Sequence, residues 1–357
     1  MSSWRHMTAH LSPSISPPGI GKVPSAASAI VGQTCCGWHI TDKLLGVGGF
    51  ARVYEGWGTS EAGPSHSGRR AAVKVVDLRL QSKWAQSKLR SEADNLKRAQ
   101  GSAHIVGFFD EIRHGPFHLF VLEACGGQSD LLDHVLEHRG LGESRAHGVL
   151  IQLLKALNWL HALNICHGDV KPENLLCERR DGLDFVKLAD FGSAMQLPPE
   201  GSADVDPIAQ GTTLYSPPEV ILSKKYSCAA DMWATGITTY VLISGNFPFG
   251  NTSDALNASA SFDGAAWGSQ LAVAFITGML RRDPNERPTA PEAQAHAWFS
   301  VPCGHHLRPS LLRSKSTRPT TMTALSEEPP VASSFLVDPH LSTTTTIALS
   351  EPPVASS

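Results

Sequence analysis

The stretch HGDVKPEN at residues 167–174, followed by FVKLADFG at residues 185–192, decides the fold of this 357-residue chain. The first stretch places an acid, a lysine and an asparagine in one short loop that apolar residues bracket closely. Such a loop supplies a proton acceptor, a cation for phosphate and an amide ligand for a metal from one piece of backbone. In the second stretch, Asp190 ends an apolar run, where its carboxylate can hold a divalent cation against phosphates.

Two features nearer the N-terminus point to the same chemistry. A Gly-rich turn spans residues 46–53 between two predicted strands, and glycines let backbone N–H groups approach phosphates closely. Alone, this turn is more typical of a plain hairpin, and it matches neither the Rossmann nor the Walker A pattern. Lys74 lies inside an apolar strand, where a lysine is rarely buried unless it is paired. Glu92 on the next helix can supply that partner.

The hydrophobic periodicity changes along the chain. Period-two runs joined by short loops predict an antiparallel sheet in the first third. These runs are residues 43–45, 52–55, 71–76 and 118–122. One amphipathic stretch, residues 82–98, predicts a helix among them, and from about residue 130 the pattern is helical. Further helices are predicted at residues 148–160, 228–245 and 266–282. A small sheet lobe followed by a larger helical lobe leaves a cleft between the two.

Taken in order, these motifs resemble those of the eukaryotic protein kinase family, across nearly all of residues 38–299. Further matches are GTTLYSPPE at 211–219, DMWATG at 231–236 and DPNERP at 283–288. The resemblance implies an α+β, bilobal fold with a small antiparallel sheet lobe carrying one helix and a larger, mainly helical lobe. It also implies that Glu219 and Arg287 form a buried ion pair that braces the large lobe.

The same resemblance implies that ATP and Mg²⁺ are bound and assigns a role to each site residue. Lys74, held by Glu92, contacts the α- and β-phosphates. Asp169 accepts the proton of the substrate hydroxyl, and Lys171 steadies the phosphoryl group in transfer. The expected metal ligands are Asn174 and Asp190. The expected nucleotide contacts come from the phosphate-covering loop (Gly46, Gly48, Ala51), the adenine-packing strands (Val53, Ala72), the gatekeeper Leu122, the hinge (Glu123, Cys125) and the ribose-binding Asp130.

The loop sequence also favours one substrate class. Lys171 lies two residues after the expected base, as in Ser/Thr kinases, and Thr212 matches a threonine typical of that group. The chain is therefore expected to act on Ser/Thr hydroxyls of protein substrates. Residues 242–249 and 294–299 look most like the calcium/calmodulin-dependent kinase group. Glu173 with Asp130 could attract an arginine upstream of the acceptor; a ribose contact plus a solvated acid is the alternative.

One departure from the family pattern carries a prediction. Gly168 stands where the family usually has an arginine that binds the activation-loop phosphate. Glu200, Asp204 and Asp206 in the adjoining loop (193–210) would repel an added phosphate. We therefore expect activity that does not depend on phosphorylation of this loop. The alternative function is a pseudokinase-like nucleotide-binding scaffold, against which stands the presence of every residue expected for phosphoryl transfer.

The two ends differ from the middle. Residues 1–37 are Ser/Pro-rich and lack acids, which predicts a disordered leader, with an organelle transit peptide as the alternative. Residues 300–357 carry ALSEEPPVASS at 324–334 and ALSEPPVASS at 348–357, which predicts a disordered Ser/Thr/Pro-rich tail. Residues 38–299 are thus expected to form the kinase domain.

Composition limits the partners. A net charge of −3 excludes a strongly basic nucleic-acid binder, and no run of eighteen apolar residues exists for a membrane span. Seven scattered cysteines do not make a disulfide framework, which favours a reducing compartment. We expect a cytoplasmic monomer, with the nucleus or an organelle as alternative locations.

Overall fold

The computed structural model describes residues 29–48, 51–125, 130–180, 183–199, 201–204, 213–223, 225–264 and 266–300. The chain divides into two units, Met1–Leu307 and Arg308–Ser357, and the first contains all of the described residues. Most of the expected leader, nearly all of the expected tail, and Thr212 with residues 205–211 lie outside the described residues.

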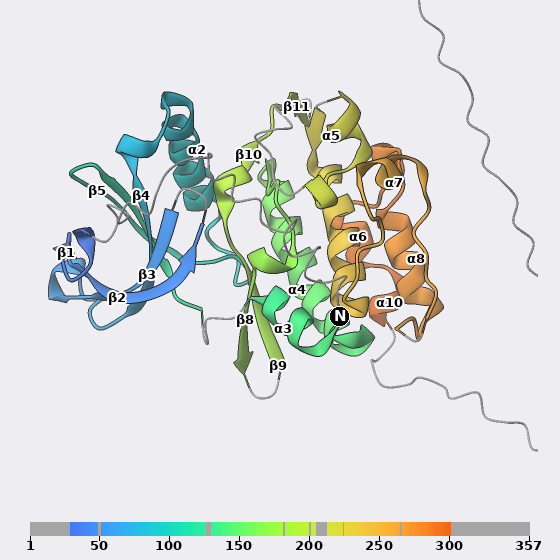
Figure 1. Cartoon of the computed structure of the whole chain (residues 1–357), viewed down its shortest axis with the longest axis horizontal. Coiled ribbons are helices and arrows are strands. Elements are labelled where there is room, and N and C mark those ends of the chain that lie inside the picture. The colour runs from blue at the N-terminus through green and yellow to red at the C-terminus, as the bar shows by residue number, and fades with distance from the viewer. Residues whose placement is uncertain are drawn as a thin grey trace, which may run out of the picture. The chain divides into compact units, whose positions relative to one another are not determined.

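Six antiparallel strands form the sheet of the small lobe, in the order β1-β2-β3-β4-β6-β5 (Figure 1). Their bounds are β1 Thr34–Cys35, β2 Trp38–Val47, β3 Ala51–Gly58, β4 Arg70–Asp77, β5 Phe108–His114 and β6 Phe117–Glu123. Val73 and Val75 of β4 are buried with Leu119 and Val121 of β6, because alternate side chains of a strand share one face. The expected antiparallel sheet is confirmed.

Helix α2 (Lys83–Ala99) packs beside this sheet in the small lobe (Figure 1). It begins at Lys83 because the Ser82 side chain accepts a hydrogen bond from the Ala85 N–H. Ala93 packs against Val76 and Phe120 of the sheet. The neighbouring Glu92 is buried as well, and it lines the cavity between the lobes.

The small lobe starts earlier than the sequence suggested. Residues 29–37 were expected in the leader, but Ile30 is 0% exposed and Cys35 1% exposed in the same core as Trp38. Strand β1 pairs with β2, with Thr34 opposite His39. The isolated apolar residues of this segment gave no periodic signal, and only the sheet edge that they cover makes their burial favourable.

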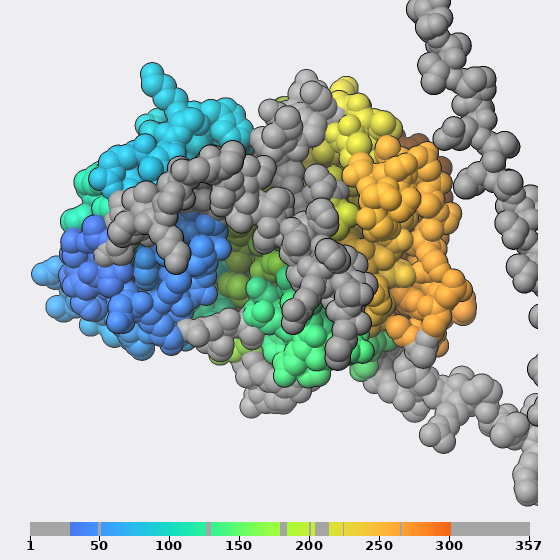
Figure 2. Space-filling view, in the orientation of Figure 1, coloured from blue at the N-terminus to red at the C-terminus, as the bar shows by residue number. Residues whose placement is uncertain are grey.

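Helices make up most of the large lobe, and Figure 2 shows its yellow and orange atoms apart from the blue small-lobe atoms. Their bounds are α3 Leu131–His138, α4 Gly142–Ala162, α5 Pro218–Ser223, α6 Cys228–Ser244, α7 Thr252–Asn257, α8 Gln270–Met279, α9 Ala290–Gln294 and α10 Ala297–Ser300. Nearly all of α6 is buried, and it packs against α4. Within the described ranges, no helix combines the length and apolar character needed to cross a membrane.

Short pairs of antiparallel strands adjoin the two sequence stretches that decide the fold, residues 167–174 and 185–192. The pairs are β7 Ile165–Cys166 with β10 Met195–Gln196 and β8 Leu175–Arg180 with β9 Leu183–Leu188; a third short pair is β11 Ser202–Asp204 with β12 Lys225–Ser227. Strand β7 ends just before residues 167–174 and β8 begins just after them. The Ala189 N–H also donates to the Asn174 carbonyl at 2.9 Å. Both polar stretches therefore meet at one edge of the large lobe.

Candidate active site

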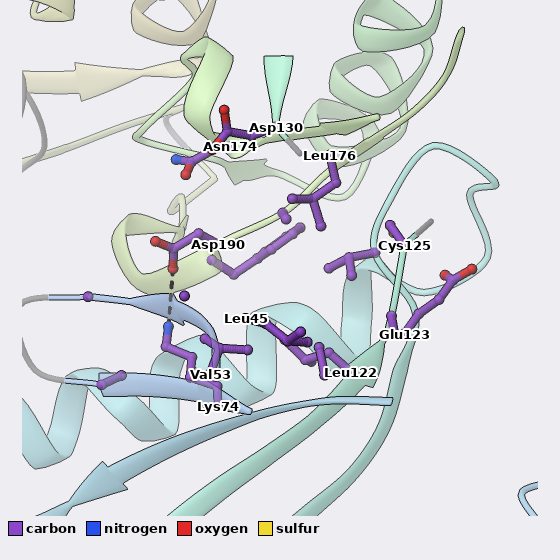
Figure 3. A pocket seen from close by; sticks show the side chains of 18 of the residues that line it. Leu45, Val53, Lys74, Leu122, Glu123, Cys125, Asp130, Asn174, Leu176 and Asp190 are labelled. Carbon is purple, nitrogen blue, oxygen red and sulfur yellow. Dashed lines mark hydrogen bonds and ion pairs between the residues drawn. The ribbon is translucent and has the colours of Figure 1, made fainter. Parts of the chain in front are cut away.

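A cavity of about 370 Å³ separates the sheet of the small lobe from the polar loops of the large lobe (Figure 3). All ten residues that the sequence assigned to nucleotide contacts line it: Gly46, Gly48, Ala51, Val53, Ala72, Lys74, Leu122, Glu123, Cys125 and Asp130. Glu92, Asn174 and Asp190 line it too, whereas Asp169 and Lys171 lie outside its lining. The cavity thus brings together strands, hinge and loops that are far apart in the sequence.

Sequence reasoning missed several apolar residues of the same cavity: Leu45, Leu96, Val106, Leu176 and Phe191. Leu176 is the informative one, because Figure 3 shows it on the large-lobe side of the cavity, opposite Val53. Its neighbour Leu175 is fully buried, and strand alternation sends the two side chains to opposite faces. The alternation of Leu175 and Leu176 in a strand was the signal in the sequence that could have identified Leu176 as a cavity residue.

Lys74 joins two acids from different elements. Its Nζ lies 2.6 Å from Glu92 Oε1 of α2 and 3.1 Å from Asp190 Oδ1. Burial alone would lower the pKa of Lys74, but Asp190 and Glu92 raise it above its usual value, so the ammonium stays charged. The same ammonium lowers the pKa of Asp190 to about 2. Asp190 is half exposed into the cavity, so its carboxylate is both ionised and accessible.

The backbone around Asp190 fixes where its carboxylate points. Asp190 has a φ of 60°, in the left-handed region that aspartate tolerates better than most residues, and its side chain accepts the Gly192 N–H. The next residue, Phe191, is buried and packs edge-on against His167, with the ring centroids 5.2 Å apart. The burial of Phe191 therefore turns Asp190 toward Lys74.

Asp169 is held by two neighbours on its own loop. Lys171 Nζ lies 2.7 Å from Asp169 Oδ2, and the Asn174 side-chain amide donates to the same oxygen at 3.0 Å. Asn174 also donates to the Asp169 carbonyl at 2.7 Å. The loop thus arranges its acid, cation and amide around one carboxylate.

This loop is anchored to α6 through Asp231. The fully buried Asp231 carboxylate accepts the N–H groups of His167 and Gly168, both at 2.9 Å, and contacts His161 Nε2 at 2.9 Å. Burial alone would raise the pKa of Asp231, but the hydrogen bond from His161 and the surrounding donors lower it. A buried acid thus holds the start of the loop in place.

Asn174 and Asp190 form a donor set suited to Mg²⁺. Both side chains extend into the same side of the cavity (Figure 3). The amide nitrogen of Asn174 is engaged by Asp169, so its carbonyl oxygen is the atom left for a cation. A carboxylate and an amide oxygen are the hard ligands that Mg²⁺ prefers. The residues present fit this ion.

Comparison with known proteins assigns the family. Residues 39–299 match the family model described as protein kinase domain. The chain belongs to the protein kinase family. The expected bilobal kinase fold is therefore confirmed.

Individual relatives of this kinase domain point to one branch. The chain is 31% identical over 265 residues to calcium/calmodulin-dependent protein kinase type 1 of Caenorhabditis elegans, covering 72% of this chain and 73% of the relative. It is 35% identical over 242 residues to calcium/calmodulin-dependent protein kinase cmkA of Emericella nidulans, with 65% and 57% covered. It is 32% identical over 266 residues to serine/threonine-protein kinase dkf-2 of Caenorhabditis briggsae, covering 72% of this chain but only 21% of that longer protein. The expected likeness to Ser/Thr kinases near the calcium/calmodulin-dependent group is confirmed.

The brace expected in the large lobe of the kinase domain is present. Arg287 donates from Nη1 to Glu219 Oε1 at 2.6 Å and from Nη2 to Glu219 Oε2 at 2.7 Å. Its fully buried guanidinium also donates to the carbonyls of Arg281, Arg282 and Ala229. All three nitrogens of the Arg287 guanidinium therefore have acceptors, and its two Nη groups join α5 with the segment before α9.

Gly168 has a conformation that suits glycine. Its φ is +80°, and a Cβ at this position would lie 2.5 Å from the Ser193 carbonyl oxygen. The kinase domain thus packs the chain after Phe191 closely against the backbone of the loop at residues 167–174. A side chain here would have to displace that backbone.

Proposed function

We propose that this chain is a Ser/Thr protein kinase that transfers the γ-phosphoryl group of ATP to hydroxyl groups of protein substrates. The observation that carries the proposal is the assembled set of Lys74, Glu92 and Asp190 in the cavity that Asn174 also lines. Phosphoryl transfer needs little covalent help, so positioned charge is the main requirement for it. A scaffold that only binds nucleotide would not need Asp169 held as it is.

Each charged group has a separate task in this proposal. Lys74 binds the α- and β-phosphate oxygens, and Glu92 prevents its ammonium from turning away. Asp169 Oδ2 is held by Lys171 and Asn174, so Oδ1 is the oxygen that we assign to the proton of the attacking hydroxyl. Lys171 then offsets charge on the transferring group.

Asn174 and Asp190 would hold Mg²⁺, which supplies charge neutralisation at the phosphates when bound. The low pKa of Asp190, about 2, keeps its carboxylate ionised at any pH where the enzyme would work. Cavity residues Val53, Ala72, Leu122 and Leu176 offer apolar surfaces to the adenine, and the hinge at Glu123 and Cys125 offers backbone hydrogen bonds.

The test is transfer of labelled γ-phosphate from ATP with Mg²⁺ to a mixed basic protein substrate, beside the Asp169→Asn variant. We expect labelled phosphoserine and phosphothreonine with the wild type, and a loss of at least about 100-fold with the variant. Absence of transfer by the wild type, with ATP still raising its melting temperature, would favour the nucleotide-binding scaffold instead.

We further propose that activity does not require phosphorylation of the loop at 193–210. Support comes from Gly168, which presents no cation at the position where the family usually has one, and from the tight approach of Ser193 to it. Phosphatase-treated protein should retain its full rate. A large loss of turnover on that treatment would contradict the proposal.

A preference for arginine upstream of the acceptor is proposed from Glu173. Its Oε2 is buried and has no hydrogen-bond partner within the described part of the chain. A substrate guanidinium would supply both the hydrogen bonds and the opposite charge. Peptides with arginine moved stepwise upstream should differ in kcat/KM, and Glu173→Gln should flatten that difference.

The cytoplasmic location and the monomeric state stay predictions from composition. Light scattering of the full chain and imaging of a tagged copy in cells would test them.

A further inference from the structure

Two cysteines meet directly behind the catalytic loop. Cys166 ends β7, one residue before His167, and Cys228 is the first residue of α6. The Cys166 thiol donates a hydrogen bond to Cys228 Sγ across 3.3 Å. Both lie beside Tyr226 and Ala230 in a small apolar cluster. Their sulfurs are thus within about 1.3 Å of bonding distance, which is about 2.05 Å for a disulfide.

The surroundings give the two thiols different chemistry. The hydrogen bond from Cys166 and the nearby His161 lower the pKa of Cys228, which favours its thiolate. Burial raises the pKa of Cys166 well above its usual value. Cys228 is also partly exposed whereas Cys166 is fully buried. Cys228 is therefore the thiol that a small oxidant reaches, and Cys166 is the one placed to react with its product.

We propose that Cys166 and Cys228 form a reversible disulfide when hydrogen peroxide reaches Cys228. The Cys228 thiolate attacks the peroxide, the O–O bond breaks, and hydroxide leaves to be protonated, so Cys228 becomes a sulfenic acid. The Cys166 sulfur then attacks Cys228 sulfur, the S–O bond breaks and water leaves with the thiol proton. With hydrogen peroxide, two thiols lose two electrons and the oxidant is reduced to two waters. A thiol reductant reverses the change.

The disulfide also alters the catalytic loop, an effect that rests on the proposed kinase function. Closing the sulfur gap moves the end of β7 toward α6. The next two N–H groups, of His167 and Gly168, are both bound to Asp231, so the movement passes into the residues that lead to Asp169. Displacements of about 1 Å near reacting groups cost up to about 100-fold in rate. The oxidised form is therefore a slow form of the enzyme.

The experiment treats the full-length chain with hydrogen peroxide and removes excess oxidant before two readouts. Mass spectrometry of non-reduced digests should show a peptide linking Cys166 to Cys228, short of two hydrogen atoms relative to the separate peptides. This readout does not depend on kinase activity, so it separates failure of the disulfide from failure of the proposed function. Phosphoryl transfer should fall at least tenfold and return with dithiothreitol.

Cysteine variants test whether Cys166 and Cys228 are the thiols that react. Cys228→Ser should abolish the linked peptide and protect transfer against peroxide, and Cys228→Ala should do the same if the serine variant folds poorly. Cys36→Ser, at an exposed thiol of the small lobe, should change neither result. Absence of the linked peptide in the wild type would overturn the proposal. A linked peptide with an unchanged rate would overturn the link to catalysis.

Discussion

Glu173 shows how one carboxyl group is changed by its surroundings. Burial raises its pKa to about 7, and the nearby charges of Asp169 and Asp130 act in the same direction. Lys171 opposes them but is engaged by Asp169. At pH 7 the carboxyl group is therefore protonated in about half of the molecules, which does not fit the solvated acid that the sequence left as one alternative.

Replacing Glu173 with glutamine should change how stability depends on pH. The folded pKa of about 7 exceeds the ordinary value of 4.5, so between these values the folded state holds a proton that the unfolded chain has released. The stability contribution is fully present below pH 4.5 and is lost as pH rises from there through the folded pKa of about 7. We expect Glu173→Gln to unfold at about the same urea concentration as the wild type at pH 5. At pH 8 it should be more stable by on the order of 1–3 kcal/mol.

The matched control for this prediction is Glu137→Gln, at a side chain that is 72% exposed on α3. It should leave the difference between the two pH values as it is in the wild type. An equal gain for Glu173→Gln at pH 5 and pH 8 would mean that titration of this carboxyl is not the cause.

Single residues of the site were largely predictable, and the reason is chemical. Lys74 in an apolar strand needs an acid, and the sequence predicts Glu92 as that acid. Lys74 Nζ and Glu92 Oε1 lie 2.6 Å apart. Leu176 was missed because an apolar residue after a polar loop has no chemistry that marks it. Its role in the cavity follows from which face of β8 it occupies, and that face depends on the packing of Leu175.

The elements were predicted where their periodicity was strong. Helix α2 was expected at residues 82–98 and spans Lys83–Ala99. Strand β5 was not expected, because it lies at the sheet edge and most of its residues are only partly buried, so the alternation is weak. Helix α8 was expected from residue 266 but begins at Gln270, since the Ser269 side chain accepts the N–H groups of Leu271 and Ala272.

The brace between α5 and the segment before α9 should dominate the stability of the large lobe. Arg287→Ala leaves the Glu219 carboxylate and several carbonyls without their buried donors, so we expect a loss of about 3–5 kcal/mol in urea unfolding. Arg281→Ala is the control, because Arg281 pairs with Glu286 at the surface, with exposed fractions of 55% and 56%. That change should cost under about 1 kcal/mol. Similar losses for the two variants would rule out a special role for the brace.

Replacing Gly168 with arginine, the residue that the family usually has at this position, should destabilise the protein. In Gly168→Arg the new Cβ would lie 2.5 Å from the Ser193 carbonyl, so the loop or its neighbour must move. We expect a loss of about 1–3 kcal/mol in thermal or urea unfolding, together with slower transfer. Gly148→Ala on α4 is the control, since nothing lies within 4 Å of its Cβ position. It should be neutral or stabilise the protein by up to about 1 kcal/mol.

For the domain as a whole, the boundary lies before the first predicted strand. Sequence composition separated the middle of the chain from its ends, but it placed residues 29–37 on the wrong side of the boundary. These residues cover the edge of the sheet. Because their apolar residues are isolated in the sequence, they show neither the helical nor the strand periodicity that would predict their burial. The burial of these residues is favourable only when the sheet that they cover has formed.

Ile30 should therefore matter as much as a residue of the domain centre. Its side chain is 0% exposed, so Ile30→Ala in the full chain should lower the free energy of unfolding by about 2–5 kcal/mol. Leu222→Ala, at a residue 71% exposed on α5, should cost under about 0.5 kcal/mol. If both variants melt at the wild-type temperature, residues 29–37 do not belong to the cooperative unit.

The anchoring of the loop at residues 167–174 by Asp231 has a consequence for exchange of amide hydrogens with heavy water. The N–H groups of His167 and Gly168 belong to a loop, but their acceptor is a fully buried carboxylate of α6. Amides exchange when their hydrogen bonds open, and this bond opens only when α6 separates from the loop. Deuterium should therefore enter these two positions as slowly as it enters α6. Deuterium uptake at the N–H groups of His167 and Gly168 would then report the opening of the entire large lobe.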